Sequence, residues 1–239
     1  MSYLQNKTIL ITGASKGIGR ATVLALASHQ TNLGLVARSE NELEQLKQAV
    51  IELGSQCEIF AGSVADESLA QKAVAKMTDR FGKVDVLINN AGYGNSKPFE
   101  TFTEKEWDDL YATNVKGTFL FSKAVAPLMK QQQSGHIIII ASDVAKRTYP
   151  TGSLYCSSKY AQHAFGDAIR KELRPFNVKV STVYSGLVDS YFHEDPEGDS
   201  SHEWWLKNDD MARSIVFIAN QPPHVVIDEF MIHPLKQDY

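Results

Sequence analysis

Short runs of β-branched and apolar residues alternate with longer helical patterns along almost the whole chain, and this alternation limits the possible fold more than any other feature. Several of the short runs are apolar throughout, which is typical of parallel strands covered on both faces. Strands joined by helices imply right-handed crossovers and an α/β fold with one doubly wound parallel sheet of seven strands and helices on both faces. Strands are expected at residues 8–11, 33–37, 58–61, 84–88, 136–141, 178–183 and 224–232, and helices near 17–29, 41–53, 67–81, 104–130, 153–173 and 209–220.

Length and composition favour one globular domain. The chain has 239 residues, of which 43% are apolar and 22% charged, and no Pro/Gly/Ser-rich linker or block of like charge divides it. We therefore expect a single domain over residues 1–239. The formal charge of −4 argues against a nucleic-acid surface, which normally shows a basic excess.

Neither a membrane span nor a metal site is expected. No apolar run approaches the roughly 20 residues needed to cross a bilayer, and the first residues reach a strand too quickly to hold a signal peptide. Cys57 and Cys156 give no disulfide framework and no metal-ligand spacing, and the histidines give none either. The sequence thus predicts a soluble, cytoplasmic protein without a metal.

A glycine-rich loop at residues 12–19 follows the first expected strand and leads directly into a helix. Gly13, Gly17 and Gly19 form the spacing G-x-x-x-G-x-G. Glycines let the backbone turn sharply and approach a pyrophosphate closely, and the N–H groups at the helix start favour an anion. Many turns between a strand and a helix need glycine for structural reasons alone, so the position after the first strand carries the argument. The loop predicts a Rossmann-type dinucleotide site.

The end of the second strand indicates which dinucleotide binds. An arginine here accommodates the 2′-phosphate of NADP, whereas an acidic residue bonds the ribose 2′-hydroxyl of NAD. The second strand is followed by Arg38 and Ser39, and Ser15 and Lys16 add donors from the glycine loop. Glu40 is the counter-signal, and an ordinary solvated role for Arg38 is the alternative. NADP(H) is the expected cofactor.

Tyr155 and Lys159 open the fifth expected helix at i, i+4 spacing, so their side chains share one face. A free tyrosine has a pKa of about 10 and is a poor proton-transfer catalyst at neutral pH. A cation beside it favours the phenolate and brings that pKa toward the working range. By itself Y-x-x-x-K is common, and its usual explanation is a surface helix.

Other polar residues follow strands in the same way. Ser142 comes directly after the strand at 136–141, and residues 89–92, of sequence Asn-Asn-Ala-Gly, follow the fourth strand. Asn114 lies inside the helix at 104–130, where an asparagine is unfavourable unless it bonds something. Ligands of open α/β sheets bind outside the carboxyl ends of the strands. Together with the glycine loop and Y-x-x-x-K, these features resemble the short-chain dehydrogenase/reductase family over roughly residues 7–190.

The resemblance implies four catalytic residues. Tyr155 would be the general acid in reduction and the general base in oxidation, and Ser142 would hydrogen-bond the substrate oxygen. Lys159 would hold the nicotinamide ribose and lower the pKa of Tyr155, and Asn114 would position a water that links Lys159 to solvent. The residues expected to contact the cofactor are Gly13, Ser15, Lys16, Gly17, Ile18, Gly19, Arg38, Ser39, Ser63, Val64, Asn90, Ala91, Gly92, Tyr155, Lys159, Gly186, Val188 and Ser190.

Two positions near the cofactor depart from the family pattern. After the third strand the family usually has Asp-Val, with the Asp on the adenine amino group, and this chain has Ser63 and Val64. After the sixth strand it usually has Pro-Gly and then a Thr that bonds the nicotinamide amide, and this chain has Ser185 and Ser190. Neither change removes a catalytic group.

The last strand bears on the substrate. Acyl-carrier-protein reductases of the family tend to end this strand in a Val-Asp-Gly-Gly-like turn. Residues 224–234 lack that turn and resemble instead the branch of small ketone, β-keto-ester and 3-hydroxy-acid dehydrogenases.

A substrate flap is expected near residues 190–207, because lids beside such sites often carry aromatic residues and this segment contains Phe192, Trp204 and Trp205. Packing of the tryptophans on a helix or a subunit is an equal alternative. Further candidates for the pocket lining are Tyr93, Tyr149 and Leu187.

The sequence thus favours an NADPH-dependent oxidoreductase that reversibly reduces a ketone, β-keto ester or related small carbonyl compound to the alcohol. A 3-oxoacyl thioester reductase and a non-catalytic NADP(H)-sensing scaffold are the alternatives. The resemblance also implies a homo-oligomer, commonly a tetramer, packed through the helices at 104–130 and 153–173.

Overall fold

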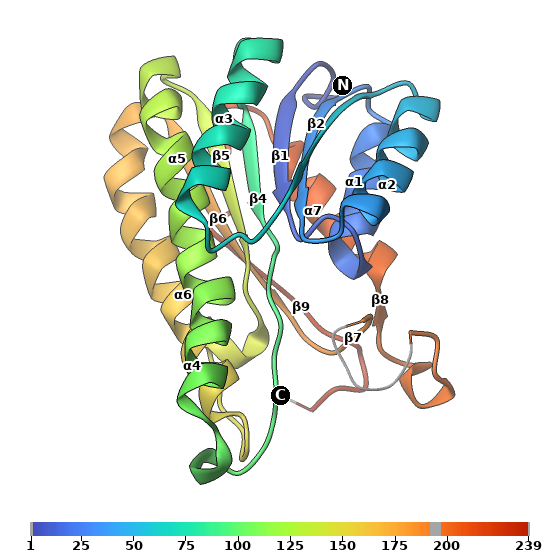
Figure 1. The fold of residues 1–239 in the computed structure, drawn as a ribbon, viewed down its shortest axis with the longest axis vertical. Coiled ribbons are helices and arrows are strands. Elements are labelled where there is room, and N and C mark those ends of the chain that lie inside the picture. The colour runs from blue at the N-terminus through green and yellow to red at the C-terminus, as the bar shows by residue number, and fades with distance from the viewer. Residues whose placement is uncertain (1, 192–196, 239) are drawn as a thin grey trace.

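A seven-stranded, all-parallel sheet forms the centre of the protein, as the alternation of strands and helices predicts (Figure 1). The computed structural model describes residues 2–191 and 197–238. Within these residues the sheet has the order β3-β2-β1-β4-β5-β6-β9, so the direction of strand addition reverses between β1 and β4. The strands are β1 Thr8–Thr12, β2 Asn32–Ala37, β3 Gln56–Ala61, β4 Val86–Asn89, β5 Gly135–Ile140, β6 Val178–Ser185 and β9 Glu229–Ile232.

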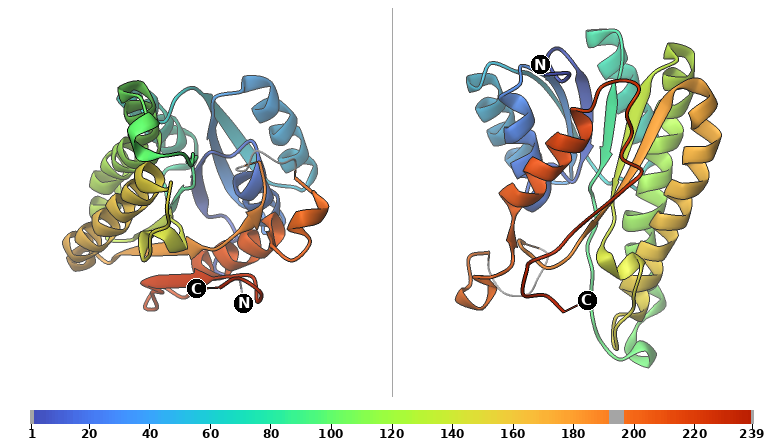
Figure 2. Two further views of the ribbon diagram at one scale, coloured as in Figure 1. Left: turned by 90° about the horizontal axis from the view of Figure 1, so that it is seen from below. Right: turned by 180° about the vertical axis from the view of Figure 1, so that it is seen from behind.

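Helices cover both faces of the sheet, which Figure 2 shows from below and from behind. One face packs against α1 Gly17–Ala27, α2 Glu40–Glu52 and α7 Asn208–Ala219, and the other packs against α3 Glu67–Phe81, α5 Gly117–Gln132 and α6 Ser153–Leu173. The residues of β5 show why both layers are needed. Ile138 and Ile140 face the first layer, while Ile137 and Ile139 face the second.

Local sequence fixes several helix ends. Asp66 caps α3 by accepting a hydrogen bond from the Ser68 N–H at 2.8 Å. Thr103 and Glu106 form a capping box at the start of α4 Glu104–Tyr111. At the other end of α3, Gly82 adopts a left-handed conformation with φ 78° and stops the helix.

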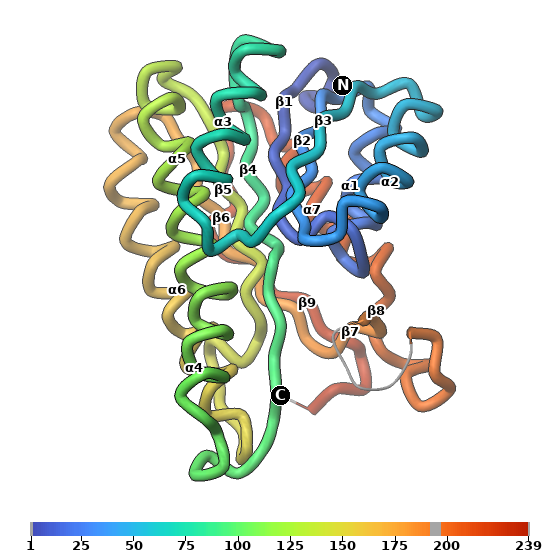
Figure 3. The backbone as a smooth tube through the Cα atoms, viewed as in Figure 1, coloured from blue at the N-terminus to red at the C-terminus, as the bar shows by residue number. Residues whose placement is uncertain are grey.

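Three features differ in detail from the sequence expectations. The expected helix at 104–130 is interrupted by a π-helical turn at Ala112–Lys116, although α4 and α5 still follow one another as one column beside α6 (Figure 3). The last strand is shorter than the expected 224–232. The segment that precedes α7 forms a small two-stranded ribbon, β7 Val188–Asp189 with β8 Leu206–Lys207.

No helix among the described residues is long and apolar enough to cross a membrane. Within the same residues no cluster of His, Cys, Asp and Glu side chains could hold a metal ion.

Candidate active site

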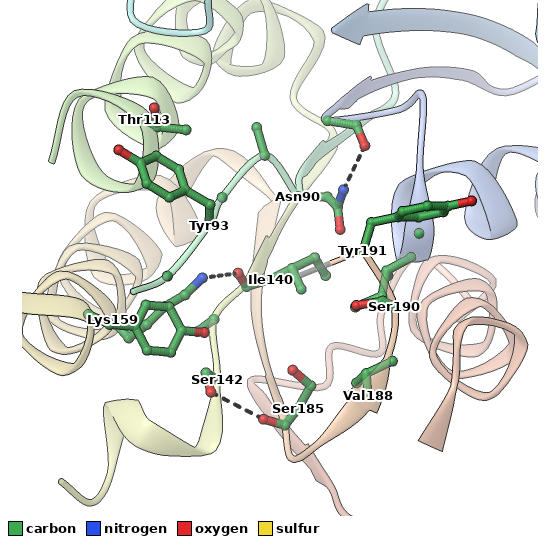
Figure 4. Close-up of a pocket in the computed structure, with 18 of the residues that line it drawn as sticks. Asn90, Tyr93, Thr113, Ile140, Ser142, Lys159, Ser185, Val188, Ser190 and Tyr191 are labelled. Carbon is green, nitrogen blue, oxygen red and sulfur yellow. Dashed lines mark hydrogen bonds between the residues drawn. The ribbon is translucent and has the colours of Figure 1, made fainter. Parts of the chain in front are cut away.

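A cavity of about 1540 Å³ lies at the carboxyl ends of the strands and contains most of the residues predicted from the sequence. Figure 4 shows Ser142 and Lys159 on one wall and Val188, Ser190 and Tyr191 across from them. Gly19 and Asn114 are not in the wall and lie behind it. The predicted residues that line the cavity are Gly13, Ser15, Lys16, Gly17, Ile18, Arg38, Ser39, Ser63, Val64, Asn90, Ala91, Gly92, Ser142, Tyr155, Lys159, Gly186, Val188 and Ser190.

The glycine loop is held in place by the loop after β4. The Asn90 and Ala91 N–H groups both donate to Thr12 Oγ1 at 3.1 Å. Asn90 Nδ2 donates to the Thr12 and Gly13 carbonyls at 3.2 and 3.0 Å. The Asn90 side chain therefore fixes the glycine loop itself.

Two glycines make this close packing possible. Gly13 has φ 64°, and a Cβ atom there would lie 2.7 Å from Ala91 Cα. A Cβ atom at Gly19 would lie 2.0 Å from the Gly13 carbonyl oxygen. Helix α1 begins at Gly17 with no side-chain cap, and Gly17 and Ile18 of its first turn line the cavity. This bare, narrow cradle fits a pyrophosphate.

The charged residues at the expected 2′-phosphate position include one that sequence reasoning missed. Glu42 lines the cavity, and its carboxylate pairs with Lys16 Nζ at 2.9 Å. Hydrogen bonds from Lys16 and Ser15 hold the pKa of Glu42 below its usual value. Sequence reasoning named Glu40 as the acidic neighbour, but the turn of α2 directs Glu42 to the loop. Ser39 helps to set this geometry, because its Oγ accepts from the Glu42 N–H at 3.4 Å.

Ser142, Tyr155 and Lys159 meet at one side of the cavity, although β5 and α6 supply them from separate parts of the chain. Lys159 Nζ lies 5.7 Å from the centre of the Tyr155 ring and donates to the Ile140 carbonyl at 3.1 Å. Ser142 donates to the Ser185 carbonyl at 3.3 Å, and both bonds are drawn in Figure 4. The exposed fractions of the three side chains are all below a tenth.

Burial controls the protonation of these groups. It raises the pKa of the Tyr155 phenol, and a hydrogen bond with Ser142 opposes that rise. It also lowers the pKa of Lys159 to about 7. Burial thus favours an uncharged Tyr155 that can donate a proton.

Asn114 occupies the π-helical turn, which explains how an asparagine is tolerated within this helical column. Its Oδ1 accepts from the Tyr93 N–H at 3.0 Å, and its Nδ2 donates to the Tyr93 carbonyl at 2.9 Å and to Ser158 Oγ at 3.1 Å. The side chain thus anchors the loop after β4 to α6. A π turn is often found at functional sites, but no pattern in the sequence predicts its position.

The two departures from the family pattern have clear local roles. Ser63 Oγ accepts from the Ala65 N–H at 3.2 Å and shapes the turn after β3. Ser185 ends β6, where its carbonyl receives the Ser142 hydroxyl. Ser190 is buried beside the glycine loop, with its Cβ 3.6 Å from where a Cβ of Gly17 would lie.

Comparison with known proteins identifies the family of this chain. Residues 7–199 match the model of the short chain dehydrogenases. The chain is 30% identical to an uncharacterized oxidoreductase from Staphylococcus epidermidis over 235 residues, covering 98% of this chain and 100% of the relative. It is also 30% identical to a sepiapterin reductase from Chlorobaculum tepidum, covering 96% and 97% of the two chains.

A solved structure agrees over nearly the whole length. The alcohol dehydrogenase from Thermococcus sibiricus, complexed with 5-hydroxy-NADP, superposes with a TM-score of 0.92 at 30% identity and covers 98% of this chain and 99% of that one. The chain belongs to the short-chain dehydrogenase family. It is therefore an oxidoreductase of a family that uses nicotinamide cofactors.

In the segment of this short-chain dehydrogenase that is expected to form a flap, the two tryptophans have different surroundings. Trp204 lines the cavity and is partly exposed, whereas the Trp205 ring stacks on His202 with centroids 3.7 Å apart. His202 and Lys207 both contact the buried Asp189 carboxylate, at 3.3 and 2.8 Å. Tyr93, Tyr149 and Leu187 also line the cavity as expected. The expectation for Phe192 lies outside the described residues.

No sequence signal pointed to four polar residues of the cavity wall, namely Asp143, Arg147, Gln237 and Ser96. Asp143 follows Ser142 and is buried, and Arg147 and Gln237 both bond its carboxylate. The Tyr149 hydroxyl is 2.8 Å from Ser96 Oγ. Gln237 is 94 residues from Asp143 along the chain, so no local pattern could join them.

Replacement of Lys159 by methionine is expected to stabilise the cofactor-free protein while it removes activity. Its pKa of about 7 in the folded protein is below the unfolded value of about 10.4, so the unfolded chain binds more protons between these limits. The resulting cost to stability is complete below about pH 7 and is relieved as the pH rises toward about 10. Lys159→Met should therefore raise the Tm by about 5 °C near neutral pH, and by less near pH 10.

Differential scanning calorimetry across this pH range tests the expectation. Lys171→Met, on the exposed side of the same helix, serves as the control and should change the Tm little. A lower Tm for Lys159→Met at neutral pH would show that the bond to the Ile140 carbonyl outweighs the cost of burying the amine.

Proposed function

We propose that this short-chain dehydrogenase is an NADP(H)-dependent oxidoreductase that reduces a ketone, β-keto ester or related small carbonyl compound to the alcohol, reversibly. The observation that carries the proposal is the meeting of Ser142, Tyr155 and Lys159 in a cavity that also contains the glycine loop and Arg38. The groups that can transfer a proton and the loop that can hold a dinucleotide thus line the same cavity. The similarity of this chain to a sepiapterin reductase and to an alcohol dehydrogenase complexed with 5-hydroxy-NADP supports the same class of reaction.

Each residue has a defined task in this proposal. The nicotinamide supplies or accepts the hydride when it is bound. Ser142 donates a hydrogen bond to the substrate oxygen, and Tyr155 gives that oxygen its proton in reduction and takes it back in oxidation. Protonated Lys159 holds the ribose and favours the phenolate after the transfer. Asn114 keeps the loop after β4 against α6, where a water can link Lys159 to solvent.

Three groups of residues would hold the cofactor. Gly13–Gly19 and the start of α1 would hold the pyrophosphate, and Arg38, Ser39 and Lys16 would hold the 2′-phosphate. The loop with Gly186, Val188 and Ser190, which lines the same cavity, would cover the nicotinamide end.

Oxidation of NADPH, and separately of NADH, with ethyl acetoacetate-type esters, aryl ketones and 3-oxoacyl thioesters tests the proposal. Turnover of free ketones or keto esters with NADPH supports it, and turnover confined to the thioesters would replace it with the acyl reductase. Tight NADPH binding without turnover of any carbonyl compound would favour a cofactor-sensing scaffold.

Removing the charge of Glu42 should strengthen NADPH binding. The carboxylate repels an incoming 2′-phosphate and engages Lys16, which the phosphate would otherwise recruit. We expect Glu42→Gln to lower the Kd for NADPH by about three-fold to ten-fold at low salt, with little change for NADH and a smaller effect at high salt.

Titration of nicotinamide fluorescence measures both constants. Glu44→Gln, on the same helix and with its carboxylate more exposed, is the matched control. Equal changes for NADPH and NADH would contradict the placement of Glu42 beside the 2′-phosphate.

A further inference from the structure

The chain after β9 returns to the candidate active site. Figure 1 shows the C-terminal segment below β9, beside the carboxyl ends of the strands. The Gly186 N–H donates to the Ile232 carbonyl at 2.8 Å, and the Gln237 N–H donates to the Pro234 carbonyl at 3.0 Å. This turn leaves Leu235 fully exposed and directs Gln237 into the cavity wall.

The Gln237 amide bridges two loops of the site. Its Nε2 donates to Asp143 Oδ2 at 2.8 Å, and its Oε1 accepts from the Leu187 N–H at 2.9 Å. The first loop follows β5 and carries Ser142. The second follows β6 and carries Gly186, Val188 and Ser190. One side chain thus ties the loop that contacts the substrate oxygen to the loop that covers the nicotinamide end.

Asp143 connects the Gln237 amide to the Ser142 hydroxyl. Ser142 Oγ lies 3.1 Å from Asp143 Oδ1, which is an alternative to the Ser185 carbonyl as acceptor for its single hydroxyl hydrogen, while Gln237 bonds the other oxygen of the same carboxylate. Arg147 Nη2 bonds that second oxygen at 2.6 Å, and His233 Nε2 is 3.5 Å from it. The carboxylate is buried and balanced by these groups, so its position depends on them.

Close packing fixes the position of the Gln237 amide. A Cβ atom at Gly186 would lie 2.2 Å from Gln237 Oε1 and 2.7 Å from His233 Cδ2. The backbone at Gly186 therefore lies directly against this side chain. The amide supplies both the oxygen that accepts from the Leu187 N–H and the nitrogen that donates to the Asp143 carboxylate, whereas a leucine at this position supplies neither.

We propose that Gln237 is a positioning residue for the reaction, holding the Ser142 loop and the loop at residues 186–190 in register. The inference rests on the proposed function for its effect on turnover, but its effect on cofactor binding is independent of the substrate. Gln237 acts through Asp143 and Leu187 and touches neither reacting atom.

The test compares Gln237→Leu with the wild-type protein, with Leu235→Ala as the control from the exposed side of the same turn. Isothermal titration calorimetry measures NADPH and the same nucleotide without its nicotinamide, 2′-phospho-ADP-ribose. Where NADH binds more tightly than NADPH, NADH and ADP-ribose take their place. We expect about ten-fold weaker binding of the complete cofactor and about ten-fold lower kcat, because small displacements of reacting groups are costly. Binding of the truncated nucleotide should not change.

A reciprocal exchange separates positioning from general stabilisation. Gln237→Glu places two carboxylates together and should lower kcat at least as much as Gln237→Leu. Adding Asp143→Asn restores an amide–carboxylate pair in reversed order, with the Glu carboxylate still able to accept from the Leu187 N–H. The double variant should recover most of the lost kcat.

Three results would overturn the inference: wild-type cofactor binding in Gln237→Leu, equal weakening of both nucleotides, or no recovery in the double variant. If the wild-type protein reduces no carbonyl compound, the proposed function fails, and the two-nucleotide comparison still decides the role of Gln237.

Discussion

Tyr155→Phe should lower kcat for carbonyl reduction by about 100-fold to 10,000-fold, the usual contribution of a positioned general acid. The substitution removes only the hydroxyl that lies beside Ser142, and the ring keeps its packing against Val144 and Cys156. The Kd for NADPH should remain within about two-fold of wild type, because the pyrophosphate and 2′-phosphate contacts are elsewhere in the cavity. Steady-state kinetics and a binding titration on the same preparation measure both quantities.

Tyr149→Phe is the matched control. Tyr149 lines the same cavity, and its hydroxyl bonds Ser96, away from Lys159. Its removal should change kcat by less than about ten-fold. If the two variants lost activity equally, the assignment of the proton to Tyr155 would be wrong.

Arg38→Leu should raise the Kd for NADPH by about 10-fold to 100-fold and leave the Kd for NADH nearly unchanged. Hydrogen bonds to a charged group contribute about 1.5–3 kcal/mol, and each 1.4 kcal/mol is about ten-fold in affinity. Arg38 is exposed at the end of β2 and lines the cavity, so its removal leaves no buried group without a partner. The ratio of kcat/KM for NADPH and NADH checks the same preference during turnover.

Arg20→Leu controls for the loss of positive charge, because Arg20 is exposed on α1 and lies outside the cavity wall. A similar loss of NADPH binding in both variants would point to the overall charge of the protein. Equal use of NADH and NADPH by the wild-type protein would show that Glu42 outweighs Arg38.

Much of the fold and the meeting of the candidate catalytic residues in one cavity were predictable, because parallel topology converts sequence position into spatial position. Ser142 and Asn90 each follow a strand, and strands of one parallel sheet end at the same edge. Tyr155 and Lys159 share a helix face through their spacing alone. These local rules bring the residues together without knowledge of any long-range contact.

The remaining features depend on contacts that no local rule contains. Glu42 reaches Lys16 only because of how α2 turns after Ser39. Gln237 reaches Asp143 only because the chain folds back after β9. The π-helical turn contains Asn114, whose side chain bonds the backbone of Tyr93. Helical periodicity in the sequence cannot reveal such a contact.

The hydrogen bonds between Asn90 and the glycine loop affect the entropic cost of nucleotide binding. Because Asn90 supplies hydrogen-bond partners to the loop from within the protein, the entropy of ordering the loop belongs to folding and not to association. Binding at this end of the cavity is then a rigid docking step, whose rate is set by diffusion and by the charges at the mouth.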